Sequence, residues 1–226
     1  MSKNMIIAID GPAGSGKSTS AKLVAQKLNY LYIDTGAMYR AITYLAMRRE
    51  CLNEIEKVIE IAEKTNITLK FENGITLVFA DGEDVTEAIR SINVNKNVSF
   101  VSKIKEVRAA LVKKQQEMGQ VTGGVVMEGR DIGTVVFPDA DIKIFLTATI
   151  DRRAERRAKE YEAGGTHVSF DEVKNNLLNR DIIDSSRKES PLKQAEDATV
   201  VDTSKVSIAE QVELILDIVK KKNKTK

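Results

Sequence analysis

The chain has 226 residues, of which 42% are hydrophobic and 30% are charged, with 35 Lys and Arg against 33 Asp and Glu. This composition is that of an ordinary globular protein and excludes an intrinsically disordered chain. The single cysteine, Cys51, excludes an intrachain disulfide and indicates a reducing compartment, so we expect a cytoplasmic protein. The longest early apolar run, residues 5–9, ends at Asp10 and is too short for a signal peptide or a membrane span.

Charge is distributed unevenly along the chain. Five lysines fall within residues 220–226, so residues 1–219 contain 30 basic and 33 acidic side chains and carry a net charge of −3. A basic tail can contact nucleic acid, but a lysine-rich end is more often a solvated helix terminus. Because no other segment is patterned for a nucleic-acid groove, we do not expect nucleic acid as a partner.

Short apolar runs that lead into glycine-rich or polar turns predict buried parallel strands at residues 5–9, 125–128 and 142–147, with shorter examples at 30–33 and 199–201. Helical periodicity occupies intervals between them, because residues 17–28 and 208–219 each place apolar side chains on one face. Strands that alternate with helices predict an α/β fold, in which a parallel sheet is covered on both faces.

One stretch replaces this alternation with an antiparallel pattern. Two β-rich runs, residues 68–71 and 76–79, flank an Asn73-Gly74 pair that is typical of a hairpin turn. A second turn at Asp81-Gly82 precedes the apolar run 85–89. We therefore expect a small antiparallel insertion at about residues 67–90.

The first predicted strand leads directly into Gly11-Pro12-Ala13-Gly14-Ser15-Gly16-Lys17-Ser18, which matches the pattern G-x-x-x-x-G-K-S between a strand and a helix. Gly14 and Gly16 allow backbone conformations that point successive N–H groups at phosphate oxygens, and the following helix adds its positive N-terminal end. Lys17 is placed to bridge the β- and γ-phosphates, and the hydroxyl of Ser18 to hold Mg2+. Together with Thr19, this loop predicts a binding site for the phosphates of a nucleoside triphosphate.

The other motifs narrow the class of nucleotide-binding protein. The D-x-x-G and N-K-x-D motifs of a GTPase are both missing, and the nearest match, Asn95-Lys96-Asn97-Val98, lacks the final Asp. A motor ATPase or a transporter usually needs a longer chain. Isolated arginines favour a small-molecule kinase, in which they hold an anionic acceptor and neutralise the migrating phosphoryl group.

Two further motifs each follow a predicted strand. Residues 34–40 read Asp-Thr-Gly-Ala-Met-Tyr-Arg, and residues 128–140 read Glu-Gly-Arg-Asp-Ile-Gly-Thr-Val-Val-Phe-Pro-Asp-Ala. With the phosphate loop and the antiparallel insertion, they resemble the bacterial cytidylate kinase family, nucleoside monophosphate kinases that act on CMP and dCMP. The resemblance runs from residue 6 to about residue 219. It implies transfer of the γ-phosphoryl group of ATP to CMP or dCMP, giving ADP and CDP or dCDP, with Mg2+ as cofactor.

The resemblance also implies a core with two mobile parts. The core would comprise residues 1–34, 120–150 and 187–226, the acceptor-binding part residues 35–119 with the insertion 67–90, and the lid residues 151–186. We expect a P-loop NTPase-type parallel sheet flanked by helices, with the antiparallel insertion and a helical lid. ATP and CMP or dCMP would be the binding partners of a monomer, with no membrane involved.

Residues that match the motifs of the family receive roles from the resemblance. The implied CMP-binding residues are Thr35, Arg40, Ser99, Arg108, Arg130, Asp131, Arg180, Asp184 and Arg187. Among these, Ser99, Arg108 and Asp131 match positions that contact the cytosine. The implied catalytic residues are Lys17 and three arginines of the lid, Arg153, Arg156 and Arg157.

Side-chain chemistry agrees with these assignments. Cytosine presents acceptors at O2 and N3 and a donor at its exocyclic amine, which suits Arg108 and Asp131. The lid arginines occupy positions i, i+3 and i+4 of a helix that begins near Asp151, so all three can face one cleft. The acceptor is a phosphate oxygen that is already ionised, so the reaction needs no general base.

Alternative interpretations remain open at this point. The arginine-rich helix can be a solvated charged surface, and Arg180 with Asp184 an ordinary i,i+4 salt bridge. Glu128 occupies a position where P-loop kinases also have Asp, and its part in the Mg2+ shell is left open. The chain could be a kinase for UMP or AMP, against which the cytosine-contacting residues argue. It could also be a non-enzymatic nucleotide-binding protein that contacts RNA through the lysine tail.

Overall fold

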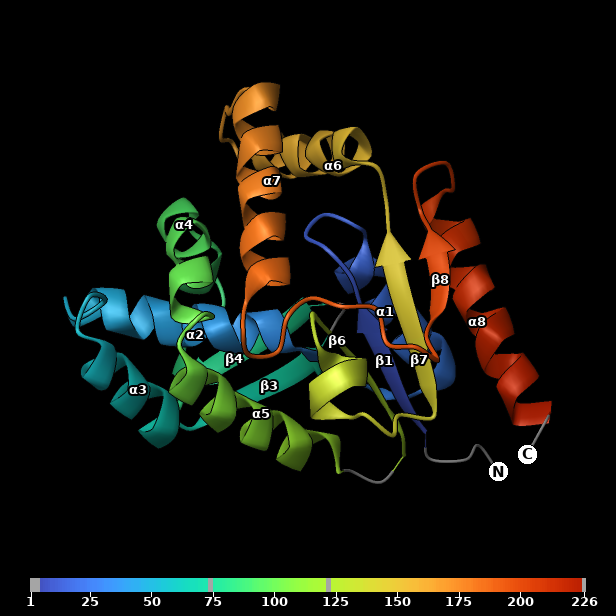
Figure 1. Ribbon diagram of the computed structural model, residues 1–226, viewed down its shortest axis with the longest axis horizontal. Helices are drawn as coiled ribbons and strands as arrows, with labels where there is room; N and C mark the ends of the chain where they lie inside the picture. The colour runs from blue at the N-terminus through green and yellow to red at the C-terminus, as the bar shows by residue number, and fades with distance from the viewer. Residues whose placement is uncertain (1–4, 73–74, 121–122, 225–226) are drawn as a thin grey trace.

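The computed structural model describes residues 5–72, 75–120 and 123–224. At its centre lies a five-stranded parallel sheet in the order β2-β6-β1-β7-β8 (Figure 1). Its strands are β1 (Ile6–Asp10), β2 (Leu31–Asp34), β6 (Val125–Gly129), β7 (Ile142–Thr147) and β8 (Thr199–Asp202). Each of the five predicted strands is thus confirmed, with its ends within one residue of the prediction.

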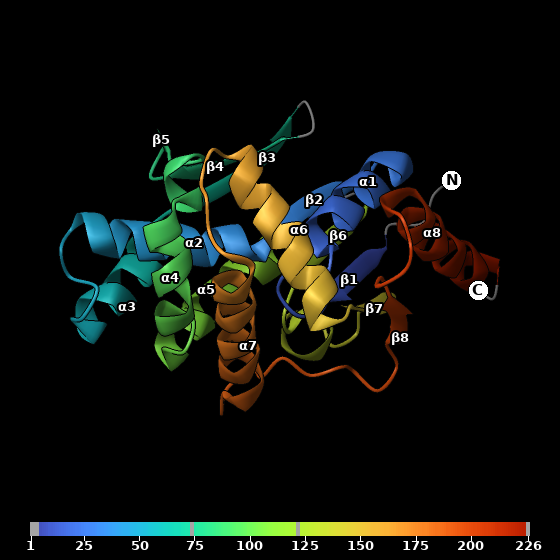
Figure 2. The ribbon, with the colours of Figure 1, turned by 90° about the horizontal axis from the view of Figure 1, so that it is seen from above.

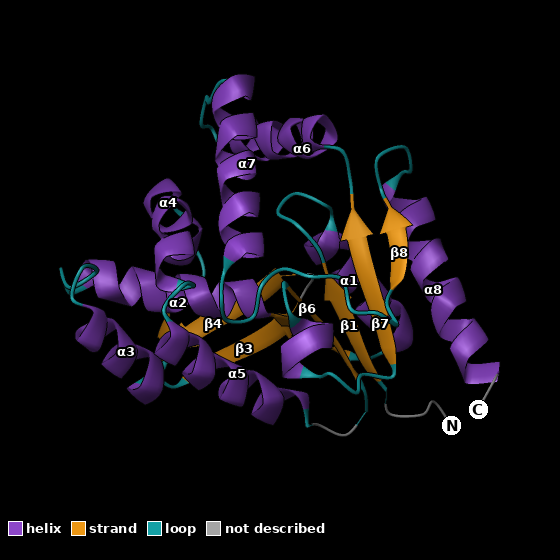
Figure 3. Cartoon of the chain, in the orientation of Figure 1, coloured by secondary structure: helices purple, strands orange, loops and turns teal. Residues whose placement is uncertain are grey.

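Helices cover both faces of this sheet, as the alternating pattern predicted (Figure 3). One face carries α1 (Lys17–Leu28) and α8 (Ile208–Lys224), whose apolar side chains pack on Ile7 and Ile9 of β1. The other carries α5 (Lys105–Gly119) and a π-helical turn, Ile132–Val136, which pack around Ala8. Because neighbouring side chains of a strand point to opposite faces, β1 is apolar on both of its sides.

The predicted acceptor-binding part has a hydrophobic core of its own. It consists of α2 (Thr35–Arg48), α3 (Ile55–Lys64), α4 (Ile92–Val101) and α5, with an antiparallel sheet of β3 (Ile67–Glu72), β4 (Ile75–Ala80) and β5 (Glu83–Asp84). The predicted insertion is confirmed, while its Asn73-Gly74 turn lies outside the described residues. The apolar run 85–89 is not a strand: Val85 and Ile89 are buried in this core, and a 3-10 turn, Ala88–Arg90, follows.

Two helices, α6 (Ile150–Ala163) and α7 (Phe170–Ser186), form the predicted helical lid and pack through Ala154, Val173 and Leu177 against Ala13 of the phosphate loop. Seen from above, α6 crosses the end of the parallel sheet and α7 lies between it and the acceptor-binding part (Figure 2). Within the described ranges no helix is long and apolar enough to span a membrane. The boundaries between core, acceptor-binding part and lid stay a prediction.

Candidate active site

A cavity of about 1120 Å³ lies at the carboxyl ends of β1, β2 and β6. Its walls come from the phosphate loop, from α2, α4 and α5 of the acceptor-binding part, and from α6 and α7 of the lid. This is the place where open α/β sheets bind their ligands, because the loops that leave parallel strands converge there. The cavity is thus lined both by the phosphate loop and by residues predicted to bind the acceptor.

The phosphate loop forms the floor on one side of this cavity. Gly14 and Gly16 have φ angles of 76° and 92°, which a residue with a side chain rarely adopts, and α1 begins directly afterwards. The ammonium of Lys17 donates to the carbonyl of Pro12 over 2.8 Å. Burial, together with the nearby Arg130, lowers the pKa of Lys17 well below its ordinary value. Negatively charged phosphates in the loop would favour the charged form again.

A hydroxyl and a carboxylate adjoin each other between the loop and the end of β6. The hydroxyl of Ser18 lies near the side chain of Glu128, and the hydroxyl of Tyr32 donates to Oε1 of Glu128 over 2.6 Å. Burial and the nearby carboxylate of Asp34 raise the pKa of Glu128. Oxygen donors of this kind fit Mg2+. The described residues contain no group of three or more His, Cys, Asp or Glu placed to hold a metal ion.

Asp184 of α7 is the centre of an arginine cluster on the acceptor side. Its carboxylate lies 2.9 Å from Nε of Arg130, 3.6 Å from Nη1 of Arg187 and 4.0 Å from Nε of Arg180. Burial alone would raise the pKa of Asp184, but these three cations hold it below its ordinary value. Burial and the nearby Arg130 lower the pKa of Arg180 to about 9.

This arginine cluster has more positive charge than its carboxylate can balance. Among the described residues, Nε of Arg180 and both Nε and Nη2 of Arg187 are buried without a hydrogen-bond partner. Buried polar groups are nearly always satisfied, so such N–H groups are available to an anionic ligand. The interpretation of Arg180 and Asp184 as an isolated helix salt bridge is therefore insufficient.

Arg108 and Asp131 form a buried ion pair beside this cluster. Nη2 of Arg108 lies 2.5 Å from Oδ2 of Asp131, and the two side chains are 4% and 6% exposed. Nη1 of Arg108 donates to the carbonyl of Ser102, and the ring of Tyr39 lies 5.3 Å from the guanidinium carbon. The structure brings together two of the three residues predicted to contact cytosine. The third, Ser99, is half-buried on α4, and it is Ser102 that lines the cavity.

Thr35 and Arg40 lie where α2 begins. The hydroxyl of Thr35 donates to the carbonyl of Glu128 over 2.7 Å. Arg40 pairs with Asp34 over 2.8 Å, and the other oxygen of Asp34 accepts from the N–H of Ala37, which caps the helix. Burial opposes ionisation of Asp34, but Arg40 holds its pKa below the ordinary value. Both predicted residues line the cavity.

The lid arginines do not share one direction, which corrects the prediction that all three face the cleft. Arg156 and Arg157 line the cavity, where Arg156 donates to Thr203 and Arg157 pairs with Glu160 over 2.9 Å. Arg153 lies instead behind the phosphate loop. Its guanidinium donates to the carbonyls of Ala13 and Ala148 and to the carboxylate of Asp181.

Packing explains the position of Arg153. A Cβ on Gly14 would lie 3.1 Å from the Cβ of Arg153, so the first turn of α6 adjoins the phosphate loop directly. The side chain of Arg153 therefore extends along the back of the loop, whereas those of Arg156 and Arg157 reach the cavity. Its contacts give Arg153 a structural position, and its predicted catalytic role stays a prediction.

The sequence interpretation missed several charged residues at or beside the cavity. Lys22 and Arg90 line the cavity, and Lys22 lies 5.9 Å from the ring centroid of Tyr32. Lys22 is four residues after Ser18 on α1, so helical spacing alone could have placed it on the same face. Asp10 is also buried beside the site, with no local motif to mark it.

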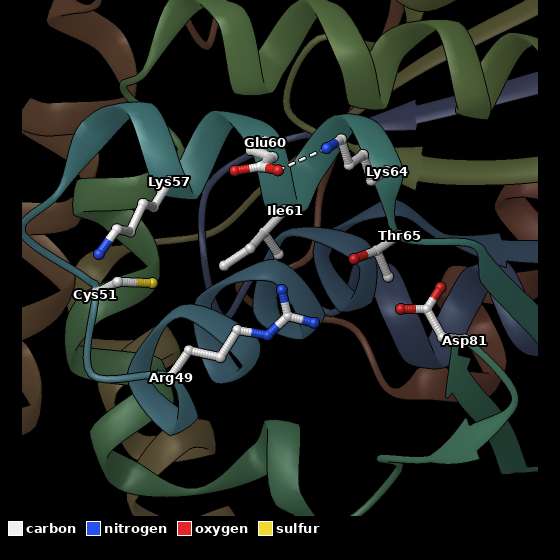
Figure 4. Close-up of a pocket in the computed structure, with 8 residues that line it drawn as sticks. All are labelled: Arg49, Cys51, Lys57, Glu60, Ile61, Lys64, Thr65 and Asp81. Atoms are coloured by element: carbon white, nitrogen blue, oxygen red, sulfur yellow. Dashed lines mark hydrogen bonds and ion pairs between the residues drawn. The ribbon is translucent and has the colours of Figure 1, made fainter.

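A second cavity, of about 350 Å³, lies beside α3 and the turn between β4 and β5 (Figure 4). Its lysines are compensated, because Lys57 pairs with Glu54 and Lys64 with Glu60. The buried thiol of Cys51, which follows α2, donates to the carbonyl of Ala46 in the last turn of that helix. None of the residues that line this cavity belongs to the phosphate loop or to the arginine cluster.

A parallel sheet whose first strand runs into a phosphate loop, opposite buried arginines and beneath a helical lid, defines a P-loop kinase with an anionic acceptor. The family model described as cytidylate kinase matches residues 7–221. The chain belongs to the cytidylate kinase family, and the predicted resemblance is confirmed.

Known proteins agree with this membership. The chain is 49% identical over 225 residues to the cytidylate kinase of Bacillus velezensis, covering 99% of this chain and 100% of that protein. It is 48% identical over 225 residues to the cytidylate kinase of Bacillus subtilis, with the same coverage. A solved structure of an uncharacterized protein from Eubacterium ventriosum has a TM-score of 0.54 at 14% identity, covering 97% of this chain and 99% of that one, and supports the fold alone.

Proposed function

We propose that the cavity holds ATP with its phosphates on residues 11–19 and CMP or dCMP at the arginine cluster around Asp184. The enzyme is a nucleoside monophosphate kinase that transfers the γ-phosphoryl group of ATP to CMP or dCMP, giving ADP and CDP or dCDP. The observation that carries the site assignment is the group of buried arginine N–H groups without partners opposite the phosphate loop. These groups suit the phosphate of a monophosphate acceptor.

On the donor side, backbone N–H groups of the loop and the ammonium of Lys17 hold the triphosphate. The hydroxyl of Ser18 would hold Mg2+, and the carboxylate of Glu128, which lies near Ser18, would hold a water of its shell. Bound Mg2+ would neutralise charge on the β- and γ-oxygens. Lys17 stabilises the same charge from the protein side.

On the acceptor side, Arg130, Arg180 and Arg187 neutralise the phosphate of the monophosphate, and Asp184 keeps them in place. Arg40, already ordered by Asp34, contributes from α2. Arg108 and Asp131 contact the cytosine, with Arg108 donating to O2 and N3 and Asp131 accepting from the C4 amine. Thr35 and Ser99 complete the set of proposed acceptor residues.

Catalysis then consists of alignment and charge neutralisation. The attacking phosphate oxygen is ionised, so no proton has to be removed before transfer. Arg156 and Arg157 leave Thr203 and Glu160 for the transferring phosphoryl group when the lid closes, and closure excludes water that would otherwise hydrolyse ATP. One chain supplies both sides of the cavity, and we propose that the enzyme acts as a monomer.

A steady-state assay of all nucleoside monophosphates with ATP and Mg2+ tests this function. CMP and dCMP should give the highest kcat/KM, with UMP about 100-fold lower, because uracil exchanges the donor and acceptor that Arg108 and Asp131 face. Asp131→Asn should bring the kcat/KM values for CMP and UMP closer together. The matched control is Asp139→Asn, an exposed residue of the same segment, which should leave the ratio unchanged. A preference for AMP or UMP would refute the proposal.

A further inference from the structure

Asp10 is a buried carboxylate that the proposed chemistry does not use. It ends β1, directly before the phosphate loop, and is 5% exposed. Its Oδ1 accepts from the N–H of Ile132 over 2.9 Å and its Oδ2 accepts from the N–H of Gly133 over 2.8 Å. A carboxylate buried to this extent destabilises a fold unless such bonds compensate it, so the position calls for an explanation.

The two N–H groups open the π-helical turn Ile132–Val136, whose N-cap residue is Asp131. The first N–H groups of a helical turn lack backbone partners, and an Asp at the N-cap ordinarily accepts from them with its own side chain. In the described structure Asp131 makes no such cap bond, and its carboxylate pairs with Arg108 instead. The cap is supplied by Asp10, a residue more than 120 positions earlier in the chain.

This replacement has a consequence for the acceptor site. Because Asp10 satisfies the backbone of Ile132 and Gly133, the carboxylate of Asp131 is free to face the cavity. The backbone that carries Asp131 is also fixed to the end of β1 and so to the root of the phosphate loop. One charged group thus connects the strand that presents the donor with the segment that selects the acceptor.

We propose that Asp10 is a positioning residue for acceptor recognition, which caps the turn after Asp131 so that the Asp131 carboxylate is held for the acceptor base. This inference rests on the proposed contact between Asp131 and cytosine. It assigns Asp10 to acceptor selection although its place in the sequence adjoins the ATP loop.

The full-length enzyme with Asp10→Asn tests the inference. The amide has the size of the carboxylate and keeps one acceptor, but it brings an NH2 group against the N–H of Gly133. We expect kcat/KM for CMP to fall about tenfold, mostly through KM, since a hydrogen bond to a charged acceptor is lost. The ratio of kcat/KM for CMP to kcat/KM for UMP should decrease, whereas KM for ATP should stay within about threefold of the wild-type value.

Two further variants separate positioning from a purely structural role. Gln211→Ala is the donor-side control, because Gln211 donates to Ser20 and to the carbonyl of Gly16; it should alter KM for ATP and leave the ratio of CMP to UMP unchanged. In an Asp131→Asn background, Asp10→Asn should no longer change the ratio, because Asp10 acts through Asp131. Circular dichroism melting checks that each variant is folded.

The outcomes distinguish this inference from the proposed function. If Asp131→Asn itself leaves the ratio unchanged, the cytosine contact fails and the inference fails with it. If Asp131→Asn narrows the ratio but Asp10→Asn lowers activity on CMP and UMP equally, or acts mainly on KM for ATP, only the positioning role is refuted. Should Asp10→Asn not fold, Asp10→Ser replaces it with the same expectation. Failure of both variants to fold would assign Asp10 to stability and overturn the inference.

Discussion

Arg153 and Arg157 lie one helical turn apart on α6, and the structure predicts that removing each side chain affects a different property of the enzyme. The guanidinium of Arg153 is 7% exposed and binds two backbone carbonyls and Asp181, over 2.6 Å in the last case. Arg157 lines the cavity, and its one ion pair within the described part of the chain is with Glu160, which is 59% exposed. Arg153→Ala should therefore lower stability, and Arg157→Ala should lower kcat.

The size of the first effect follows from burial. Breaking a buried ion pair by removing one partner costs about 3–5 kcal/mol. Asp181 is 24% exposed and can recover part of its hydration, so we expect about 3 kcal/mol for Arg153→Ala. Arg157→Ala should change the free energy of unfolding by less than about 0.5 kcal/mol. Its kcat should fall about 100-fold, as when one donor to a transferring group is removed.

Urea unfolding followed by circular dichroism measures the free energy of unfolding. Steady-state kinetics with saturating ATP and CMP measures kcat. Arg152→Ala serves as the matched control, because Arg152 lies on the same turn, is 45% exposed and pairs only with Glu155 among the described residues. It should change neither property. If Arg153→Ala unfolds at the wild-type urea concentration and loses kcat as Arg157→Ala does, the structural position of Arg153 is refuted.

Further predictions concern the donor loop, the insertion and pH. Lys17→Ala should abolish turnover in a folded protein, and wild-type kcat would contradict the assignment of the phosphate loop. Arg90→Ala should raise KM for CMP severalfold and spare KM for ATP, since Arg90 reaches the cavity from the insertion side; an effect on ATP alone would contradict this. Burial raises the pKa of Asp10 from 3.8 to about 6, so the folded protein retains a proton that the unfolded chain releases between these values. Stability should therefore fall by about 3 kcal/mol as pH rises from 4 to 6 and then level off. Asp10→Asn should abolish this fall in urea titrations, and an equal fall in both proteins would contradict the raised pKa.

Local sequence determined the parts of this protein whose geometry is local. The phosphate loop was predicted because its glycines, Lys17 and Ser18 are contiguous and lie between one strand and one helix. The strands of the parallel sheet were predicted because each is a short apolar run, and the central strand β1 is buried on both faces. The insertion was predicted from its two β-rich runs, but the sequence pattern did not show that Val85 and Ile89 of the following apolar run fill the core under α2.

Tertiary structure alone decided which charged groups meet. Asp184 and Arg130 are 54 residues apart, and Asp10 and Gly133 are 123 apart, so no spacing rule joins them. The three arginines of α6 in the lid show why sequence spacing is not enough. Spacing of three and four residues indicates that Arg153, Arg156 and Arg157 lie near each other, but it does not say which neighbour each side chain meets. The close contact of Gly14 with Arg153 turns that arginine behind the loop and leaves the other two in the cavity, because a packed interface admits only one arrangement of its side chains.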